Sequence, residues 1–352
     1  MSCSFAGPRS SVGDVAQQAL QPVSSVAETS ISKPRLKIDF ADFWGHFEKT
    51  DNYFWHLLSR NYELELSPDP DFLIYSAYGR EFAHYDCFRI FYTGENVRPD
   101  FNECDFAFSF DYLETPRHYR LPLYALYADN SILIGRKIDP ERLLKEKTRF
   151  CNFIVSNPVC DKRNDFFRLL SQYKKVDSAG RYLNNIGWQL PNNPPAKWEF
   201  IRPYKFTIAF ENASYPGYTT EKIFEPLMTD GLPIYWGNPL VDRDFNRRRF
   251  LNLHSFRDEY ELIERIVQID NEDDLYLEYL SEPSFSGDEL NSYVDPTNVL
   301  RQFAFIVSQK GHTQPLARTR QRFYTVAKGA RLWGEQKVAA VRDRMSRLTL
   351  RE

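Results

Sequence analysis

Short stretches of alternating apolar and polar residues recur along the chain, and segments with apolar residues three and four positions apart follow them. Residues 206–210 (FTIAF) are typical of a strand, and the segment that begins after Thr220 is typical of a helix. The apolar run 151–156 (CNFIVS) and the amphipathic segment after it repeat this pair. Strands that alternate with helices predict an α/β fold with a parallel sheet.

The first half of the chain carries the same pattern. Strands are predicted at LKIDFADFWGHF from Leu36, at Phe72–Tyr75, at Phe88–Tyr92 and at Cys104–Phe110. A helix is predicted near residues 54–58, and the Pro- and Tyr-rich stretch 115–129 is expected to be a loop.

The length of 352 residues is too great for one typical domain and sufficient for two domains with tails. We expect a disordered N-terminal segment at 1–32, which is poor in aromatic residues. Two α/β domains are expected at 33–145 and 146–312, separated near a charged stretch at 136–148. The remaining residues, 313–352, form a basic amphipathic tail.

Two of the predicted strand-to-helix turns carry a cation where the helix begins. Lys222 follows Thr220 in one turn, and Lys162 and Arg163 occupy the other. The N-terminus of a helix is partly positive and favours anions, so a cation at this point indicates that something negative is bound in front of it. A plain surface lysine is the alternative for Lys222 alone. Two such turns side by side predict a diphosphate site in a nucleotide-binding domain.

A carboxylate follows the predicted strand at 88–92. Glu95 comes directly after Gly94, where the strand gives way to a loop. Ligands of open α/β sheets bind at the carboxyl ends of the strands, so Glu95 is a candidate catalytic carboxylate. The alternative is that Glu95 caps or solvates the turn.

The cysteines, histidines and DxD aspartates are candidate metal ligands by residue type. The five cysteines form no CxxC pair and the six histidines show no metal-binding spacing, so no metal site is predicted. The DxD strings Asp69–Asp71 and Asp242–Asp244 are interpreted mainly as turn residues. His118, in the Tyr-rich stretch, is a hypothetical acceptor contact. We expect a cytoplasmic protein, because no apolar run approaches the ~20 residues of a membrane-spanning helix and no leader pattern is found. We expect no nucleic-acid partner.

The tail differs in charge from the rest of the chain. Residues 316–352 contain ten Lys or Arg against three acidic residues. Apolar residues at helical spacing on both sides of Gly334 predict two short basic amphipathic helices. Such helices would lie on an anionic membrane surface, at the inner face of the membrane. The alternative is a tail that packs on the body or stays mobile.

Four motifs in order resemble those of one enzyme family. They are FYTGEN at 91–96, CNFIVSNP at 151–158 with Arg163 downstream, FENASYPGYTTEKI at 210–223, and PIYWGNPLVDRDFN at 233–246. Together they are similar to bacterial α-1,3-fucosyltransferases of glycosyltransferase family 10, of the Helicobacter type, and the likeness extends from Lys33 to Phe305. The resemblance implies a GT-B fold, in which two Rossmann-like domains face one another across a cleft. The first would take the acceptor and the second GDP-L-fucose.

The resemblance also implies roles for individual residues. Glu95 corresponds to the general base. The residues that correspond to the donor site are Arg163, Asn212, Tyr218, Glu221 and Lys222. In the family, Arg163 and Lys222 would neutralise the diphosphate, with Tyr218 as a further phosphate ligand. Glu221 would bind the ribose hydroxyls.

The implied reaction is a single displacement with inversion that needs no divalent metal or other cofactor, since cations of the protein serve the leaving group. The expected acceptor is O3 of GlcNAc in N-acetyllactosamine-type glycans, as in Lewis x synthesis on a lipopolysaccharide. Transfer to type 1 chains or lactose remains an alternative. So do another GT-B nucleotide-sugar transferase and a non-catalytic glycan-binding protein.

Overall fold

The computed structural model describes residues 32–191 and 193–349. The chain divides into a unit at Met1–Lys33 and a unit at Pro34–Glu352. The expectation of disorder at 1–32 therefore lies almost wholly outside the described residues. The second unit contains two sheets, with strand orders β2-β1-β3-β4-β5-β6 and β11-β10-β9-β7-β8, and their strand pairs are parallel.

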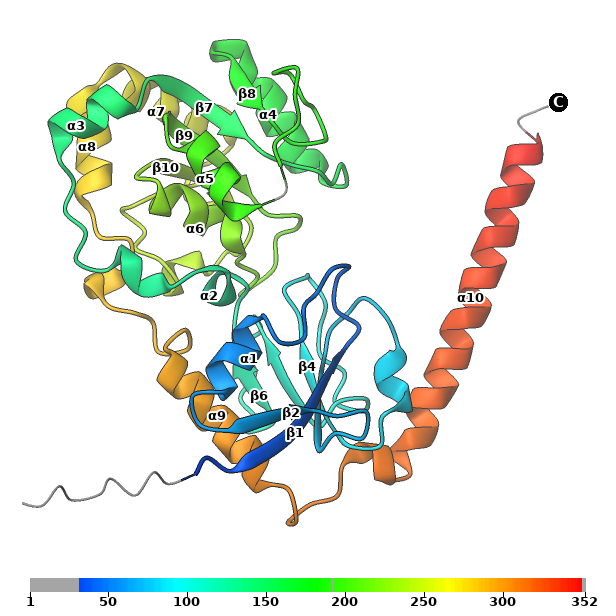
Figure 1. Cartoon of the computed structure of the whole chain (residues 1–352). Coiled ribbons are helices and arrows are strands. Elements are labelled where there is room, and N and C mark those ends of the chain that lie inside the picture. Colours follow the sequence, from blue (N-terminus) through cyan, green and yellow to red (C-terminus); the bar gives the residue numbers. More distant parts are fainter. Residues whose placement is uncertain (1–31, 192, 350–352) are drawn as a thin grey trace, which may run out of the picture. The chain divides into compact units, whose positions relative to one another are not determined.

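The first sheet is built from the first half of the chain (Figure 1). Its elements are β1 (Arg35–Ala41), α1 (Tyr53–Leu58), β2 (Glu63–Leu66), β3 (Phe72–Tyr75), β4 (Phe88–Tyr92), β5 (Phe106–Ser109) and β6 (His118–Arg120). Every residue of β3, β4 and β5 is buried, as expected for central strands covered on both faces. The predicted strands are confirmed, although the first ends at Ala41 and the fourth covers only Phe106–Ser109. The stretch expected to be only a loop also contains β6 and the short helix α2 (Tyr124–Tyr127).

The second sheet follows the same plan. Its elements are α3 (Pro140–Glu146), β7 (Arg149–Phe153), α4 (Asp161–Tyr173), β8 (Val176–Ser178), α5 (Pro194–Ile201), β9 (Tyr204–Phe210), α6 (Glu221–Met228), β10 (Leu232–Trp236), β11 (Leu251–Asn252), α7 (Glu259–Asn271) and α8 (Asp273–Ser281). Several helices begin at a polar side chain that accepts a hydrogen bond from the first turn, among them Asn193, Thr220 and Asp258. These N-caps therefore determine the residue at which each loop ends and its helix begins.

Helix α9 (Pro296–Ser308) lies beside the first sheet in Figure 1, although it follows the second sheet in sequence. Its Phe303 stacks on Phe108 of β5, with 4.6 Å between ring centroids, and meets Phe54 of α1 at 6.0 Å. The chain therefore returns to its first sheet after completing the second.

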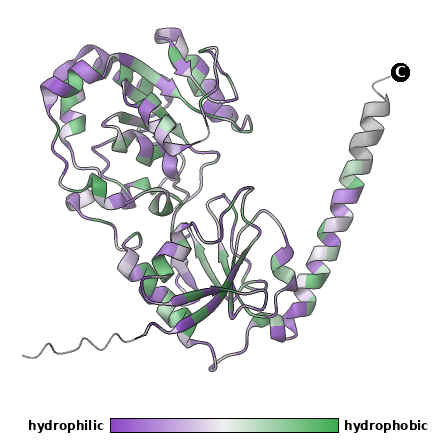
Figure 2. Cartoon of the chain, in the orientation of Figure 1, coloured by the Kyte–Doolittle hydropathy of each residue, from purple (hydrophilic) through white to green (hydrophobic). Residues whose placement is uncertain are grey.

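The tail forms one helix, α10 (Gln321–Thr349), which runs through Gly334 without a break. The prediction of two short helices was wrong there, because a single glycine inside a helix costs only about 1 kcal/mol relative to alanine. Figure 2 shows hydrophilic and hydrophobic residues mixed over the part of α10 that it colours. The first turns are docked, since Lys328 Nζ contacts Asp100 at 2.5 Å and Glu103 at 2.7 Å. None of the helices in the described part of the chain is long and apolar enough to cross a membrane.

Candidate functional site

The turn between β9 and α6 contains a buried acid that the sequence analysis missed. Glu211, the residue after β9, is 0% exposed. Its Oε1 accepts a hydrogen bond from the Thr220 backbone N–H at 2.7 Å, and its Oε2 accepts one from the Thr220 hydroxyl at 2.7 Å. The Lys222 ammonium lies 3.2 Å from the same Oε2. Glu211 could have been found from the sequence as an acid directly after a buried strand, at the sheet edge that carries the cations.

The charges of this turn influence one another. Burial lowers the pKa of Lys222, but the neighbouring carboxylates of Glu211 and Glu221 outweigh it and the pKa is raised, so Lys222 stays charged. Burial raises the pKa of Glu211, against the effect of Lys222. Burial also opposes the ionisation of Glu221, but Lys222 and Lys197 hold its pKa below the usual range. Lys222 is therefore not a free surface lysine.

Arg163 lies at the start of α4 and is 1% exposed. Its Nη1 donates to Asn212 Oδ1 at 2.7 Å, and its Nη2 donates to the Asn157 carbonyl at 2.7 Å. Its Nε has no hydrogen-bond partner among the described residues. Because β7 and β9 are paired, the α4 and α6 turns are neighbours at one edge of the sheet. The structure thus brings Arg163 and Asn212 into direct contact there.

Tyr218 lies in the same turn and is 1% exposed. Its ring packs against Phe110 of the first half of the chain, with 5.1 Å between centroids. Gly217 before it has φ +87°, and a Cβ there would stand 2.2 Å from the Phe110 carbonyl oxygen, so only glycine allows this close approach. The Tyr218 side chain is held against the first sheet as a result.

Glu95 follows β4 and is half-buried. Its Oε1 accepts a hydrogen bond from the Tyr78 hydroxyl at 2.8 Å, and its backbone N–H donates to the Thr93 hydroxyl at 3.0 Å. Burial is the largest cause of the raised pKa of Tyr218, and the negative charges of Glu211 and Glu95 add to it. Glu95 is therefore within electrostatic reach of the turn between β9 and α6 (the donor-side turn). Tyr78, which sequence reasoning missed, follows β3, the neighbour of β4.

A cavity of ≈ 450 Å³ opens beside the turn between β9 and α6. Side chains that line it include Tyr127, Arg181, Lys197 and Glu221. Cavities of this size hold small organic ligands, and this lining offers an aromatic ring, cations and a carboxylate. The arrangement can bind a nucleoside, with Glu221 available to accept hydrogen bonds from ribose hydroxyls. Lys197 and Arg181 were not predicted from the sequence.

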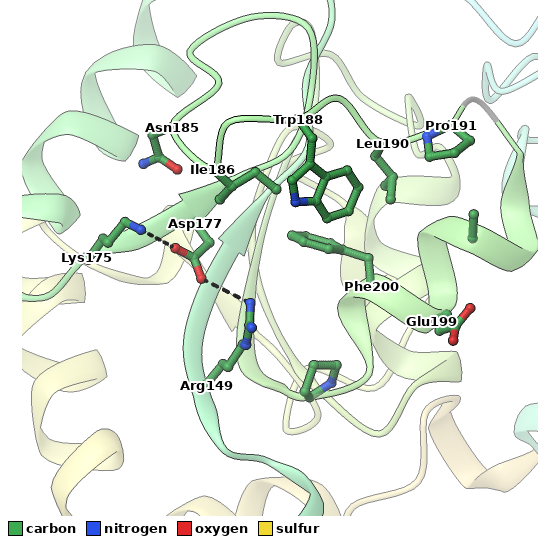
Figure 3. A pocket seen from close by; sticks show the side chains of 12 residues that line it. Arg149, Lys175, Asp177, Asn185, Ile186, Trp188, Leu190, Pro191, Glu199 and Phe200 are labelled. Carbon is green, nitrogen blue, oxygen red and sulfur yellow. Dashed lines mark ion pairs between the residues drawn. The ribbon is translucent and has the colours of Figure 1, made fainter.

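A larger hollow of ≈ 880 Å³ lies where β7 and β8 begin (Figure 3). Trp188 meets Phe200 there edge to face at 5.9 Å. Asp177 lies between Lys175 at 3.0 Å and Arg149 at 3.6 Å, so these charges compensate one another. Arg149 begins β7, whereas Arg163 follows its other end. Leu190 and Pro191 line both this hollow and the smaller cavity, so the two adjoin one another.

Two minor hypotheses can be compared with the structure. His118 is buried, lies 2.9 Å from the Ser109 hydroxyl, and has its pKa lowered to about 4 by burial, so it does not face an open acceptor site. Asp244 is also buried and pairs with Arg120. Within residues 32–191 and 193–349, no group of three or more His, Cys, Asp or Glu side chains could hold a metal ion.

Comparison with known families identifies the two halves of the chain. Residues 38–127 match the N-terminal domain of α-(1,3)-fucosyltransferase FucT, and residues 144–283 match the C-terminal region of glycosyltransferase family 10. The chain belongs to the family 10 fucosyltransferases. The first matched region contains Glu95 and Tyr78, and the second contains Arg163, Glu211 and Lys222.

Proteins of similar sequence agree with this family. The α-(1,3)-fucosyltransferase FucT of Helicobacter pylori is 33% identical over 299 residues, 72% of this chain, and the chain spans 61% of that relative's length. Human GDP-fucose protein O-fucosyltransferase 3 is 32% identical over 187 residues, 49% of this chain and 39% of its own length.

Solved structures extend the likeness to the fold. An α1,3-fucosyltransferase crystallised with GDP matches with a TM-score of 0.66 at 28% identity, covering 82% of this chain and 94% of its own. The complex with GDP-fucose matches with a TM-score of 0.65 at 27% identity, covering 87% of this chain and 94% of its own. These matches confirm the α/β fold of GT-B type that the sequence resemblance implied.

Proposed function

We propose that this chain is an inverting fucosyltransferase that transfers L-fucose from GDP-β-L-fucose to a hydroxyl group of a glycan. The observation that carries the proposal is the pair of neighbouring turns at the edge of the second sheet. There Arg163 and Lys222 stand at the starts of two helices, beside a cavity that Glu221 lines. The solved relatives crystallised with GDP and with GDP-fucose support the same donor.

The donor would bind with its diphosphate between the two turns. Lys222 has three N–H bonds, so it can keep its contact with Glu211 and still donate to a phosphate oxygen. The Arg163 guanidinium, with Asn212 and a backbone carbonyl holding its two terminal nitrogens, is fixed in orientation. Glu221 would accept the ribose hydroxyls, and Tyr218 would supply a further phosphate contact. Charges fixed in advance stabilise the leaving GDP without reorganisation.

The reaction would be one displacement. The acceptor oxygen forms a bond to the anomeric carbon of fucose while the bond from that carbon to the β-phosphate oxygen breaks, and GDP leaves with the electron pair. Glu95 takes the hydroxyl proton. The hydrogen bond from Tyr78 to Oε1 orients the carboxylate and leaves Oε2 for that proton. No divalent ion has a role in this sequence of events.

The acceptor would lie beside Glu95, where two aromatic side chains are exposed. Tyr78 is 52% exposed and Trp44 is 44% exposed, and their rings meet edge to face at 6.4 Å. Exposed aromatic faces next to a base suit the apolar face of a sugar ring. We favour O3 of GlcNAc in N-acetyllactosamine-type glycans, as in Lewis x, with type 1 chains and lactose as alternatives.

The tail supports a location on the inner face of the membrane. Among its side chains, Phe323 is 75% exposed and Trp333 60% exposed, on a helix rich in arginine. Exposed apolar and basic side chains together favour anionic lipid surfaces. The enzyme would then be cytoplasmic and peripheral, acting on a lipid-linked glycan such as a lipopolysaccharide.

The deciding experiment is transfer by the purified full-length chain. GDP-fucose is offered with N-acetyllactosamine, a type 1 disaccharide and lactose, and the product linkage is determined by NMR. We expect an α-linked fucose on O3 of GlcNAc, and the same rate in EDTA. A chain that binds these glycans but turns over no nucleotide sugar would be the non-catalytic alternative, and turnover of another nucleotide sugar only would indicate a different transferase.

A further inference from the structure

Side chains from other parts of the chain hold the segment between Gly217 and Thr220. The Gly217 N–H donates to Asn238 Oδ1 at 2.7 Å, and the Thr219 hydroxyl donates to Asp244 Oδ2 at 2.8 Å. Asn238 Nδ2 in turn donates to the Thr219 oxygen at 3.0 Å. This segment carries Tyr218 and ends at the cap of α6, so its position sets the donor-side turn.

Arg120, the last residue of β6, reaches this segment from the first sheet. Its Nη2 donates to Asp244 Oδ2 at 2.9 Å and to the Gly217 carbonyl at 3.2 Å. Its Nη1 lies 2.9 Å from Asp244 Oδ1. The guanidinium lies over the rings of Tyr112 and Tyr293, whose centroids are 4.5 and 4.4 Å from it.

The ion pair is sealed from solvent. Arg120 is 8% exposed and Asp244 is 2% exposed. The net stabilisation by such a pair is small, because the cost of desolvating both charges offsets much of their attraction. A planar guanidinium that engages two carboxylate oxygens and a carbonyl oxygen fixes direction as well as distance. The contact thus fixes the Gly217–Thr220 segment relative to β6.

We propose that Arg120 and Asp244 are positioning residues for donor binding, which hold the Gly217–Thr220 segment through Thr219 so that Tyr218 and Lys222 meet the diphosphate. Neither residue touches the donor. The proposal rests on the proposed function, because it assigns the support of that same donor site. It places one determinant of donor affinity on a strand of the domain expected to bind the acceptor.

The test replaces Thr219, whose hydroxyl connects the pair to the segment. Thr219→Val keeps the shape and removes the hydroxyl, whereas Thr219→Ser keeps the hydroxyl. The KM for GDP-fucose, the KM for N-acetyllactosamine, kcat, the Kd for GDP by calorimetry and the Tm are measured for the full-length chain. We expect Thr219→Val to raise the donor KM and the GDP Kd about tenfold, a change equivalent to about 1.4 kcal/mol. Thr219→Ser should stay within about twofold of wild type.

Two further variants distinguish positioning from stability. Arg120→Lys keeps the charge but cannot span both carboxylate oxygens and the Gly217 carbonyl, so it should raise the donor KM and leave the acceptor KM unchanged. Arg249→Lys is the matched control, since Arg249 is 3% exposed and its Nη1 donates to the Gly231 carbonyl at 3.0 Å. It should lower the Tm without changing the donor KM.

The outcomes separate this proposal from the proposed function. A Thr219→Val or Arg120→Lys chain with a lower Tm but a wild-type donor KM and GDP Kd would make the network structural only. A rise in the acceptor KM alone for Arg120→Lys would assign Arg120 to the first domain's own site and overturn the proposal. A wild-type chain that neither binds GDP nor transfers fucose would instead refute the function itself.

Discussion

Glu211 and Lys222 form a salt bridge, with 3.2 Å between Oε2 and Nζ, at the junction of β9 and α6. Thr220 joins the two, since its backbone N–H and hydroxyl both donate to Glu211 and its hydroxyl accepts from Lys222 Nζ at 3.1 Å. A lysine at the start of a helix is unfavourable, because the helix dipole makes this end partly positive. The carboxylate of Glu211 compensates the charge of Lys222 before any ligand binds. This pairing determines how a donor-site mutation should behave.

Replacing Lys222 should affect stability and donor binding together. Lys222→Ala leaves the Glu211 carboxylate buried without its cation, which costs about 3 to 5 kcal/mol in a buried pair. The double variant Lys222→Ala/Glu211→Gln removes that buried charge and should recover most of the lost unfolding free energy. The affinity of the double variant for GDP should remain as low as that of Lys222→Ala, because both lack the cation. Urea unfolding and calorimetry with GDP measure the two effects, and recovery of GDP affinity in the double variant would contradict a phosphate role for Lys222.

Glu95→Gln tests the base. The amide preserves size and can still accept the Tyr78 hydrogen bond, but it cannot take a proton. We expect transfer to fall by about 10² to 10⁴-fold, with the Kd for GDP unchanged. Glu114→Gln, an exposed acid in a neighbouring loop, is the control and should transfer at the wild-type rate. Full activity of Glu95→Gln would remove Glu95 from the mechanism.

Trp44 is predicted to bind the acceptor. Trp44→Ala should raise the KM for N-acetyllactosamine by about 2- to 10-fold, as expected for the loss of one aromatic contact worth about 0.5 to 1.5 kcal/mol, and leave the GDP Kd unchanged. Trp188→Ala is the matched control, because Trp188 is similarly exposed (51% against 44%) but lies in the hollow of Figure 3, which Trp44 does not line. Equal acceptor KM values for the two variants would exclude a Trp44 platform.

The docked start of α10 changes how the membrane role of the tail should be tested. Tyr324 and Lys328 contact Asp100, five residues after Glu95. A chain ending at Leu332 keeps these contacts and loses Trp333 and the arginines beyond it. It should fail to float with anionic vesicles while transferring fucose to a soluble acceptor at the wild-type rate. A chain ending at Gln314 should also lose thermal stability, and equal flotation of all three chains would reject membrane binding.

Lys147 should make the stability of the fold depend on pH. The residue is 4% exposed, and its ammonium donates to the carbonyls of Arg202 and Thr229, both at 2.6 Å. Burial lowers the pKa of Lys147 to about 7, below its unfolded value of 10.5. Between these values the unfolded chain binds more protons, so stability should increase as pH rises from about 7, by at most about 1.4 kcal/mol per pH unit.

The measurement compares urea unfolding between pH 6 and pH 9 for wild type and Lys147→Met. The variant should lack this part of the slope. Lys145→Met, two residues away and exposed, is the control and should retain it. Parallel curves for wild type and Lys147→Met would show that Lys147 does not titrate in this range.

Much of the fold was predictable because the signals are local. The apolar run at 206–210 makes a strand that is buried on both faces, and Thr220 starts a helix. Both signals depend on neighbours in sequence, the first on a short apolar run and the second on a side chain that satisfies the first N–H groups of the helix. The same local logic identified Arg163 and Lys222 as cations at helix starts. The roles of these residues remain predictions.

What sequence alone determined was the succession of strands and helices, the cations at two helix starts and the family to which the motifs belong. Only the tertiary structure decided that Glu211 compensates Lys222, that Tyr78 meets Glu95 and that Arg120 reaches Asp244, residues up to 124 positions apart. The physical reason is that helix and strand signals act over a few residues, whereas a buried charge is stabilised by whichever partner the packed sheets bring within hydrogen-bond distance.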